Sequence, residues 1–461
     1  MADIKNLRRS LTVTPATAVI LANIIGTGVF VKARVMTCNV GSPSMVLAVW
    51  VFAGLLTMAG ALVYAELGSM IPRSGGEARF LGSAFGDRWA FLYGWTKTVA
   101  LGASAAATSI LCVIFLNDLS GGQFSTLTMQ LLPVLIIVGT VGINLLTVKS
   151  SGWFATALTM VKVLLVISIG VGAFFLIDGA SANYAMSNGA TGTCEGVPES
   201  AKLGIGGFGA AMLGALWGYN GWAILAAIGG EIKDPARTVP RALIGGTLLV
   251  IVLYLFINAA FFNVMTPLEI ASVSENSSVA GEVAARVFGP GVAALLALGL
   301  AISAAGTTHT TILSGPRVPY ALAKDGLLPK GVGYVNRAGV PAVAIIGVGA
   351  WSIVLAVSGT FDILTDIYVF VLWVFFAMNG VGLFVLRKKR PDAERPYKVW
   401  GYPVVPILFL ITAAYLLINT LIVSTQNALV GVAFILVGLP LYSYFTRHRS
   451  TAASDSSPGN T

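Results

Sequence analysis

Long apolar runs, separated by short polar segments, dominate the pattern of residues along the chain. A helix that crosses a bilayer needs about 20 mostly apolar residues, and twelve runs approach that length. They lie at roughly residues 12–33, 44–66, 89–116, 127–148, 153–177, 206–230, 241–263, 288–314, 341–358, 361–386, 404–424 and 427–445. The pattern predicts an all-α polytopic membrane protein with twelve transmembrane helices.

Two of these runs are interrupted in mid-span by residues that form helices poorly. The first contains Ile24-Ile25-Gly26-Thr27-Gly28-Val29-Phe30, and the sixth contains Trp217-Gly218-Tyr219-Asn220-Gly221-Trp222. A broken membrane helix frees backbone N–H and C=O groups, which are tolerated only against protein or a water-filled cavity. Glycine also serves close helix packing, but paired interruptions in two halves of a chain are the best sequence sign of a transporter binding site.

The paired interruptions also predict the organisation of the chain. If the first and sixth runs correspond, runs 1–5 and 6–10 form two five-helix units, and because five is odd the second enters the membrane from the opposite side. This is a 5+5 inverted repeat. We therefore expect a transport core at 12–386, a basic loop at 387–403 and two further helices at 404–446, with terminal segments at 1–11 and 447–461.

Composition and charge agree with an integral membrane protein. Only 10% of the residues are charged, against about 25% in soluble domains, and the mean hydropathy is +0.85. With the N-terminus inside, most of the 28 Lys and Arg residues fall in inside segments, and the outside loops hold only Lys32, Arg34, Lys202 and Arg286. This asymmetry follows the positive-inside rule, so both termini are expected in the cytoplasm.

Several other classes of protein find no support in the sequence. Cys38, Cys112 and Cys194 are too few for a metal site, although the first and last both fall in expected outside segments and their pairing stays open. No phosphate-binding loop or dinucleotide fingerprint occurs, and with His309 and His448 as the only histidines no catalytic set can be assembled. We expect no enzyme activity, cofactor, metal or nucleic-acid partner, and a channel is a less favoured alternative.

The freed backbone groups suit a zwitterionic ligand. The N-terminal ends of half-helices carry a partial positive charge, which places a carboxylate near Thr27 and Gly28. Exposed carbonyls of the two breaks can accept from an α-ammonium group, and those expected to do so belong to Ile24, Ile25, Trp217 and Gly218. Neither 24–30 nor 216–222 contains an acidic residue, so neutral side chains are favoured over cationic ones.

Motifs spread over nearly the whole chain resemble one family. They are Tyr64-Ala65-Glu66-Leu67-Gly68, Ser74-Gly75-Gly76-Glu77, Gly230-Glu231-Ile232-Lys233-Asp234-Pro235-Ala236-Arg237, Arg395-Pro396-Tyr397-Lys398 and Gly401-Tyr402-Pro403. Together they resemble the amino acid–polyamine–organocation superfamily, and within it the L-type amino acid transporter branch of light-subunit-like proteins. The resemblance implies a leucine-transporter-like fold and amino acid uptake or exchange without sodium.

Lys162 stands out because about ten apolar residues flank it on either side. An intramembrane lysine costs a few kcal/mol unless it has a partner, and is a functional candidate by default; a lysine snorkelling from a helix end fits this position badly. The resemblance implies that the ammonium replaces a sodium ion and bridges helix 1 and helix 8. Helix 8 offers Ser303 and Thr307 one turn apart.

The resemblance also suggests residues that line the pocket. Trp217 stands where relatives often carry a phenylalanine that closes over the substrate, and Asn220 replaces a frequent glycine. Phe370 and Trp373 match pocket-lining positions of helix 10, although aromatic residues in membrane helices usually belong to the core or the interface. Lys97, beside Trp95, has candidate acidic partners such as Glu66, and the sequence assigns it no role.

These observations predict a sodium-independent transporter of neutral L-amino acids that works by alternating access in the cell membrane, as expected for a bacterial inner membrane. An exchanger is favoured, and a proton-coupled symporter, in which Lys162 or His309 titrates, is the alternative. The outer loop at 117–125 has no cysteine, so no disulfide-linked heavy subunit is expected.

Overall fold

The computed structural model describes residues 11–71, 76–146, 152–179, 181–187, 189, 191–223 and 232–454. The expected terminal segments and the Gly230-Glu231 part of one motif therefore lie wholly or partly outside the described residues, as do Ser74 and Gly75. Among the described residues the secondary structure is helical, with a single isolated bridge between Leu11 and Ile232 and no strand.

The helices follow one another with short connections. The first half of the chain contains α1 (Val13–Ile24), η1 (Gly28–Phe30), α2 (Lys32–Val40), α3 (Pro43–Met70), α4 (Gly76–Phe85), α5 (Asp87–Leu119), α6 (Thr126–Leu146), α7 (Gly152–Phe175), η2 (Ser181–Ala185), η3 (Glu199–Ala201) and α8 (Gly204–Gly218). The second half contains α10 (Pro235–Val264), α11 (Pro267–Ala271), α12 (Val279–Phe288), α13 (Pro290–Ser314), α14 (Arg317–Lys324), η5 (Lys330–Gly333), α15 (Ala342–Ser358), α16 (Phe361–Lys389), α17 (Val404–Val423) and α18 (Thr425–Ser454).

The apolar helices agree with a polytopic membrane protein. Eight described stretches, in α3, α5, α6, α10, α13 with α14, α16, α17 and α18, are long and apolar enough to cross a bilayer. Four shorter apolar helices, Val13–Ile24, Met160–Phe175, Gly204–Gly218 and Ala342–Ser358, coincide with the first, fifth, sixth and ninth predicted runs. The all-helical polytopic class is thereby confirmed, whereas the twelve-helix count and the inverted repeat stay predictions.

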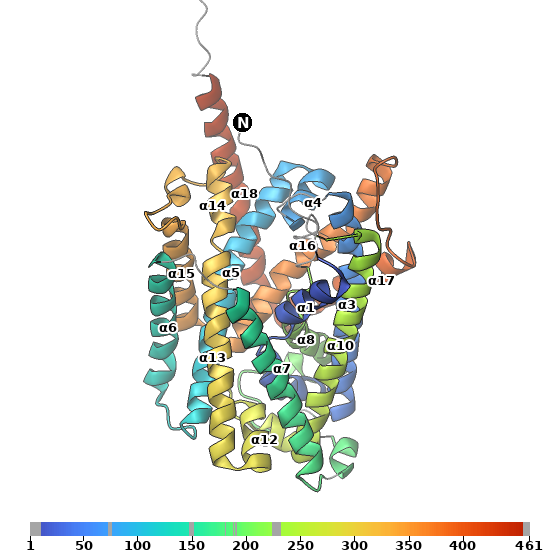
Figure 1. The fold of residues 1–461 in the computed structure, drawn as a ribbon, viewed down its shortest axis with the longest axis vertical. Helices are drawn as coiled ribbons and strands as arrows, with labels where there is room; N and C mark the ends of the chain where they lie inside the picture. Colours follow the sequence, from blue (N-terminus) through green and yellow to red (C-terminus); the bar gives the residue numbers. More distant parts are fainter. Residues whose placement is uncertain are drawn as a thin grey trace, which may run out of the picture.

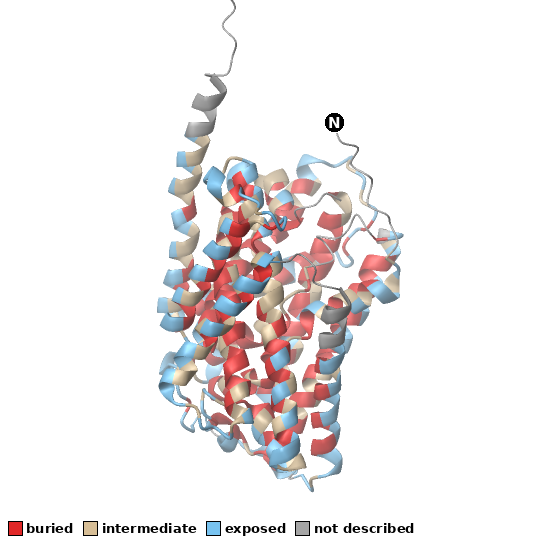
Figure 2. Cartoon of the chain, turned by 60° about the vertical axis from the view of Figure 1, so that its left-hand side comes forward, coloured by how far each residue is buried: buried red, intermediate tan, exposed pale blue. Residues whose placement is uncertain are grey.

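The long helices run roughly parallel in one bundle (Figure 1), with α4, α14 and the end of α18 at its upper end and α12 at its lower end. Buried residues fill the interior and exposed ones lie outside (Figure 2). Most exposed side chains of α6 and α17 are apolar, including Leu131, Leu135, Ile411 and Ile422, as expected of surfaces that face lipid.

Small residues let α5 lie at the centre of the bundle, where it packs against α13, α15 and α16. An added Cβ at Gly102 would lie 2.2 Å from Cδ1 of Trp351 on α15, so only glycine allows this approach. The Gly-Ala-Ser run at 102–107 is buried. The close packing leaves α5 as one wall of the site described below.

Both predicted interruptions are present. α1 ends at Ile24, and the chain turns before η1 and α2 resume the path. α8 ends at Gly218 and is followed by a turn at 219–223. Gly221 has a φ of +108°, and a Cβ there would lie 2.4 Å from the carbonyl oxygen of Asn23. The two breaks therefore pack directly against each other, and glycine is required at the point of contact.

The structure corrects one expectation about the outer segments. The sequence assigned Lys32 and Arg34 to an outside loop, but both lie in α2, with only 1% and 4% of their surfaces exposed. Such burial of two cations requires anionic partners. Those partners come from α16.

Candidate functional site

A cavity of about 380 Å³ lies where the two broken helices meet. Its walls come from the break after α1, the end of α8, and from α5, α7, α13 and α16. Ten of the residues singled out from the sequence line it: Ile24, Ile25, Gly26, Thr27, Gly28, Lys162, Trp217, Gly218, Asn220 and Thr307. Ser303, Phe370 and Trp373 are not among the lining residues.

The backbone carbonyls of the two breaks share one donor. The hydroxyl of Tyr254, buried in α10, lies 3.1 Å from the carbonyl oxygen of Ile24 and 2.8 Å from that of Gly218. A phenol has a single proton to donate, so it serves one of these carbonyls at a time. The cavity wall thus retains capacity to accept a hydrogen bond at the place assigned to an α-ammonium group.

The two glycines of the first break have different surroundings: Gly26 faces open space, and Gly28 lies against Trp217. An added Cβ at Gly26 would meet only atoms of its own segment, at 3.7 and 3.9 Å, so this backbone faces open space. At Gly28 the Cβ would lie 2.7 Å from Cδ1 of Trp217. The indole of Trp217 therefore lies directly against the backbone at which the carboxylate is expected.

Trp217 belongs to an aromatic group that closes one side of the cavity. Its ring lies edge-on to Tyr368 at 5.1 Å and to Phe361 at 6.2 Å, both on α16. The Asn220 amide nitrogen donates to the Tyr368 hydroxyl at 3.1 Å. Tyr368 lines the cavity, and sequence reasoning missed it.

Phe370 and Trp373 face other helices. Trp373 packs on Phe409 of α17, with ring centroids 5.8 Å apart. An added Cβ at Gly431 of α18 would lie 2.8 Å from Cδ1 of Phe370. The structure therefore places both side chains against α17 and α18, and presents Tyr368 to the cavity.

Lys162 of α7 lies in the cavity wall with 7% of its surface exposed. Its ammonium is 3.5 Å from the hydroxyl of Thr307 on α13, and no carboxylate of the described residues lies within 4 Å of it. The Thr307 hydroxyl donates to the carbonyl of Ser303, whose own hydroxyl is fully buried without a described partner. Lys162, Thr307 and Ser303 therefore lie next to one another, and the Lys162 ammonium contacts α13 through the Thr307 hydroxyl.

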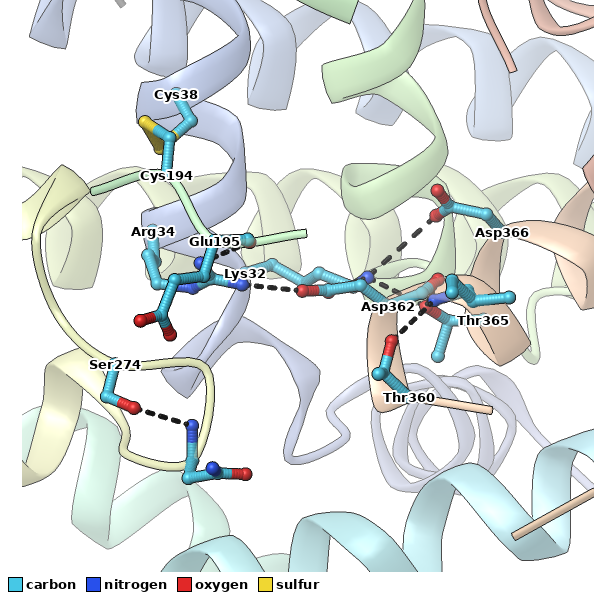
Figure 3. A network of polar contacts seen from close by, with 12 residues as sticks. Lys32, Arg34, Cys38, Cys194, Glu195, Ser274, Thr360, Asp362, Thr365 and Asp366 are labelled. Carbon is cyan, nitrogen blue, oxygen red and sulfur yellow. Dashed lines mark hydrogen bonds and ion pairs between the residues drawn. A yellow bond between two sulfur atoms is a disulfide. The ribbon is translucent and has the colours of Figure 1, made fainter. Parts of the chain in front are cut away.

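A network of two buried cations and two partly exposed aspartates joins α2 to the start of α16 (Figure 3). The Lys32 ammonium lies 2.7 Å from both Asp362 Oδ1 and Thr365 Oγ1, and 3.9 Å from Asp366. Arg34 donates to Asp362 Oδ2 at 3.0 Å. We call these five residues the outer network. The sequence did not predict the outer network, because Lys32 and Arg34 were expected in an outside loop.

A disulfide joins α2 to the segment that precedes α8. Cys38 and Cys194 are bonded, which answers the pairing that the sequence left open. Arg34 also donates to the carbonyl of Glu195 at 2.9 Å, and the backbone N–H of Leu203 donates to the carbonyl of Asn39 at 2.6 Å. α2 and this segment therefore form one cross-linked unit.

At the opposite end of the bundle, the acidic partner of Lys97 is a residue other than Glu66. Its ammonium lies 3.6 Å from Glu77 and 2.7 Å from the Tyr93 hydroxyl. Glu66, fully buried, instead accepts from Arg387 at 2.8 and 2.6 Å. Two carboxylates were available to Lys97, and the resemblance could not decide between them.

Comparison with known proteins identifies the family. The amino acid permease family model matches residues 11–444. The chain belongs to the amino acid permease family. Over 441 residues this permease is 31% identical to the serine/threonine exchanger SteT of Bacillus subtilis (strain 168), covering 95% of this chain and 96% of that protein.

Two further relatives extend the comparison. The permease is 30% identical to the b(0,+)-type amino acid transporter 1 of Mus musculus, over 96% of this chain and 89% of that protein. It is 27% identical to the large neutral amino acids transporter small subunit 2 of Mus musculus, over 97% of this chain and 83% of that protein. The predicted superfamily and its L-type-like branch are confirmed, and the permease is an amino acid transporter, not an enzyme.

Proposed function

We propose that this permease is a sodium-independent exchanger of neutral L-amino acids that works by alternating access. The cavity at the two broken helices carries the proposal. Its wall combines accepting carbonyls at Ile24 and Gly218 with freed backbone at Thr27 and Gly28. That combination suits the ammonium and carboxylate of one amino acid. A relative named as a serine/threonine exchanger supports both exchange and neutral substrates.

Sodium independence is proposed from Lys162. A charged ammonium beside Thr307 disfavours a second cation at the same oxygen atoms, because two unit charges 4 Å apart repel by about 4 kcal/mol at an effective dielectric constant of 20. The fixed charge would take the place of a bound sodium ion in linking α7 to α13.

Access to the cavity is proposed to open alternately at its two ends. The lining residues Asn23 and Ser314 are exposed, and Ser314 ends α13 next to α14 at the upper end of the bundle. At the other end the outer network closes α2 against α16. Beside that network lies a second cavity of about 580 Å³, lined by Asp362, Asp366 and the 196–201 segment. We propose that this second cavity is the outer approach.

The end that carries α14 is proposed to face the cytoplasm, with the protein in the cell membrane of a bacterium and both termini inside. The excess of basic residues in the segments assigned to that side supports this orientation. The disulfide at Cys38 and Cys194 supports it too, because disulfides persist in oxidising compartments. A disulfide-linked heavy subunit is not part of the proposal, since 117–125 contains no cysteine.

Transport by purified protein in liposomes tests the proposal. Uptake of a labelled neutral amino acid should require unlabelled amino acid inside and should be unaffected when choline replaces sodium. An imposed pH gradient that drives uptake into empty liposomes would favour the proton-coupled alternative, in which Lys162 titrates. Stimulation by sodium would refute sodium independence, and uptake that never saturates would point to a channel.

A further inference from the structure

Two polar side chains from different helices meet in the wall of the cavity, next to Trp217. Asn220 comes from the turn after α8, and Tyr368 comes from the second turn of α16. Both line the cavity, and the Asn220 amide nitrogen lies 3.1 Å from the Tyr368 hydroxyl oxygen. Neither is part of the backbone site for the ammonium and carboxylate groups.

The contact between them uses only part of their hydrogen-bonding capacity. The Asn220 amide donates and the Tyr368 oxygen accepts. The phenolic proton of Tyr368 and the carbonyl oxygen of Asn220 make no hydrogen bond recorded for the described residues. An amide oxygen accepts two hydrogen bonds and a phenol donates one. The pair therefore holds one donor and one acceptor side by side in the cavity wall.

That combination matches side chains that both donate and accept, which are hydroxyl and amide groups, and the smaller of these is the hydroxyl. A hydroxyl group both donates and accepts, an ammonium group only donates, a carboxylate only accepts, and an aliphatic group does neither. The ring of Trp217, 5.1 Å from that of Tyr368, limits the room beside the pair. We propose that Asn220 and Tyr368 select amino acids with a small hydroxylated side chain over aliphatic amino acids of the same shape.

The proposal rests on the proposed function, since it assigns a side-chain preference to the same cavity. Threonine and valine make the sharpest comparison, because a hydroxyl in one replaces a methyl in the other. When valine occupies the site, the pair loses its bonds to water without gaining a partner. One or two neutral hydrogen bonds predict that threonine binds about tenfold more tightly than valine.

The test measures threonine and valine affinities by thermal shift of the purified protein and by competition for exchange in liposomes. Tyr368→Phe keeps the ring against Trp217 and removes the donor, and Asn220→Ala removes the acceptor. In each variant threonine affinity should fall severalfold while valine affinity changes little, so that the ratio approaches one. The persisting valine affinity shows that the variant is folded.

Tyr219→Phe is the matched control. It also removes one buried phenol hydroxyl, but this hydroxyl donates to the carbonyl of Trp50 at 3.0 Å and Tyr219 does not line the cavity. The control should keep the parental ratio. An unchanged ratio in both Tyr368→Phe and Asn220→Ala, or a parent that binds valine as tightly as threonine, would overturn the inference alone. A parent that binds no amino acid would overturn the proposed function itself.

Discussion

The proposed closure of the outer approach by the outer network can be tested at Asp362. Its carboxylate accepts from Lys32 at 2.7 Å and from Arg34 at 3.0 Å, and these two side chains are only 1% and 5% exposed. Asp362→Asn would leave two nearly buried cations facing a neutral amide. Removing one partner of a buried ion pair costs about 3–5 kcal/mol. We take about 3 kcal/mol, because Thr365 and the carbonyl of Glu195 remain as partners.

If the outer network forms only while the outer approach is closed, this cost destabilises the closed state relative to the state in which the outer approach is open. Every 1.4 kcal/mol is a factor of ten, so about 3 kcal/mol favours the outer-open state by roughly 150-fold. Hydrogen–deuterium exchange of the α2 amides should then rise. Exchange turnover in liposomes should fall, because each cycle must return through the disfavoured closed state.

Asp366→Asn is the matched control. It removes a carboxylate one helical turn further along α16, whose nearest oxygen lies 3.9 Å from the Lys32 ammonium. Its effect on both measurements should be small. If Asp362→Asn exchanged amide hydrogens and substrate like the parent, or if both variants behaved alike, the outer network would have no special part in closing the route.

Four further predictions address the remaining features. Gly28→Leu should abolish uptake in correctly inserted protein, because a Cβ there already meets Trp217 at 2.7 Å; normal uptake would refute the carboxylate site proposed at this backbone. Trp217→Ala should slow transport at unchanged surface expression, whereas Trp217→Phe should be tolerated, and equal activity of both variants with the parent would make Trp217 an ordinary packing residue. Lys162→Ala should lower turnover more than substrate affinity, as kinetic measurements would show, and full activity would contradict its role. Cys38→Ser should lower the free energy of unfolding by about 2–4 kcal/mol, seen as a lower unfolding temperature that Cys194→Ser reproduces.

The broken helices could be predicted from the sequence because their signals are local. Gly-Thr-Gly at 26–28 and Asn220-Gly221 interrupt apolar runs and weaken helices wherever they occur. Lys162 could be identified in the same way, because a charged residue within an apolar span is unusual whatever its spatial neighbours are.

The outer network could not be predicted in the same way. Lys32 and Asp362 are 330 residues apart in the chain. Only the folded bundle brings the two charges together, so neither residue reveals its ion pair in the sequence. In a predicted outside loop, Lys32 is expected to be an ordinary exposed cation.

The sequence could not separate the aromatic residues of α16 for a different reason. Tyr368, Phe370 and Trp373 are all buried. Residues 367–376 are apolar or aromatic on every side of the helix, so no polar stripe reveals which face meets the cavity. Resemblance pointed to Phe370 and Trp373, whereas the structure turns Tyr368 toward Trp217.

The bond between Cys38 and Cys194 also constrains how the molecule is made. The two cysteines are 156 residues apart, and α3, α5, α6 and α7 lie between them in the chain. Both thiols must reach the same side of the membrane before they can join. The bond can therefore form only after these helices have been inserted, and once formed it closes the first half of the chain into a covalent loop.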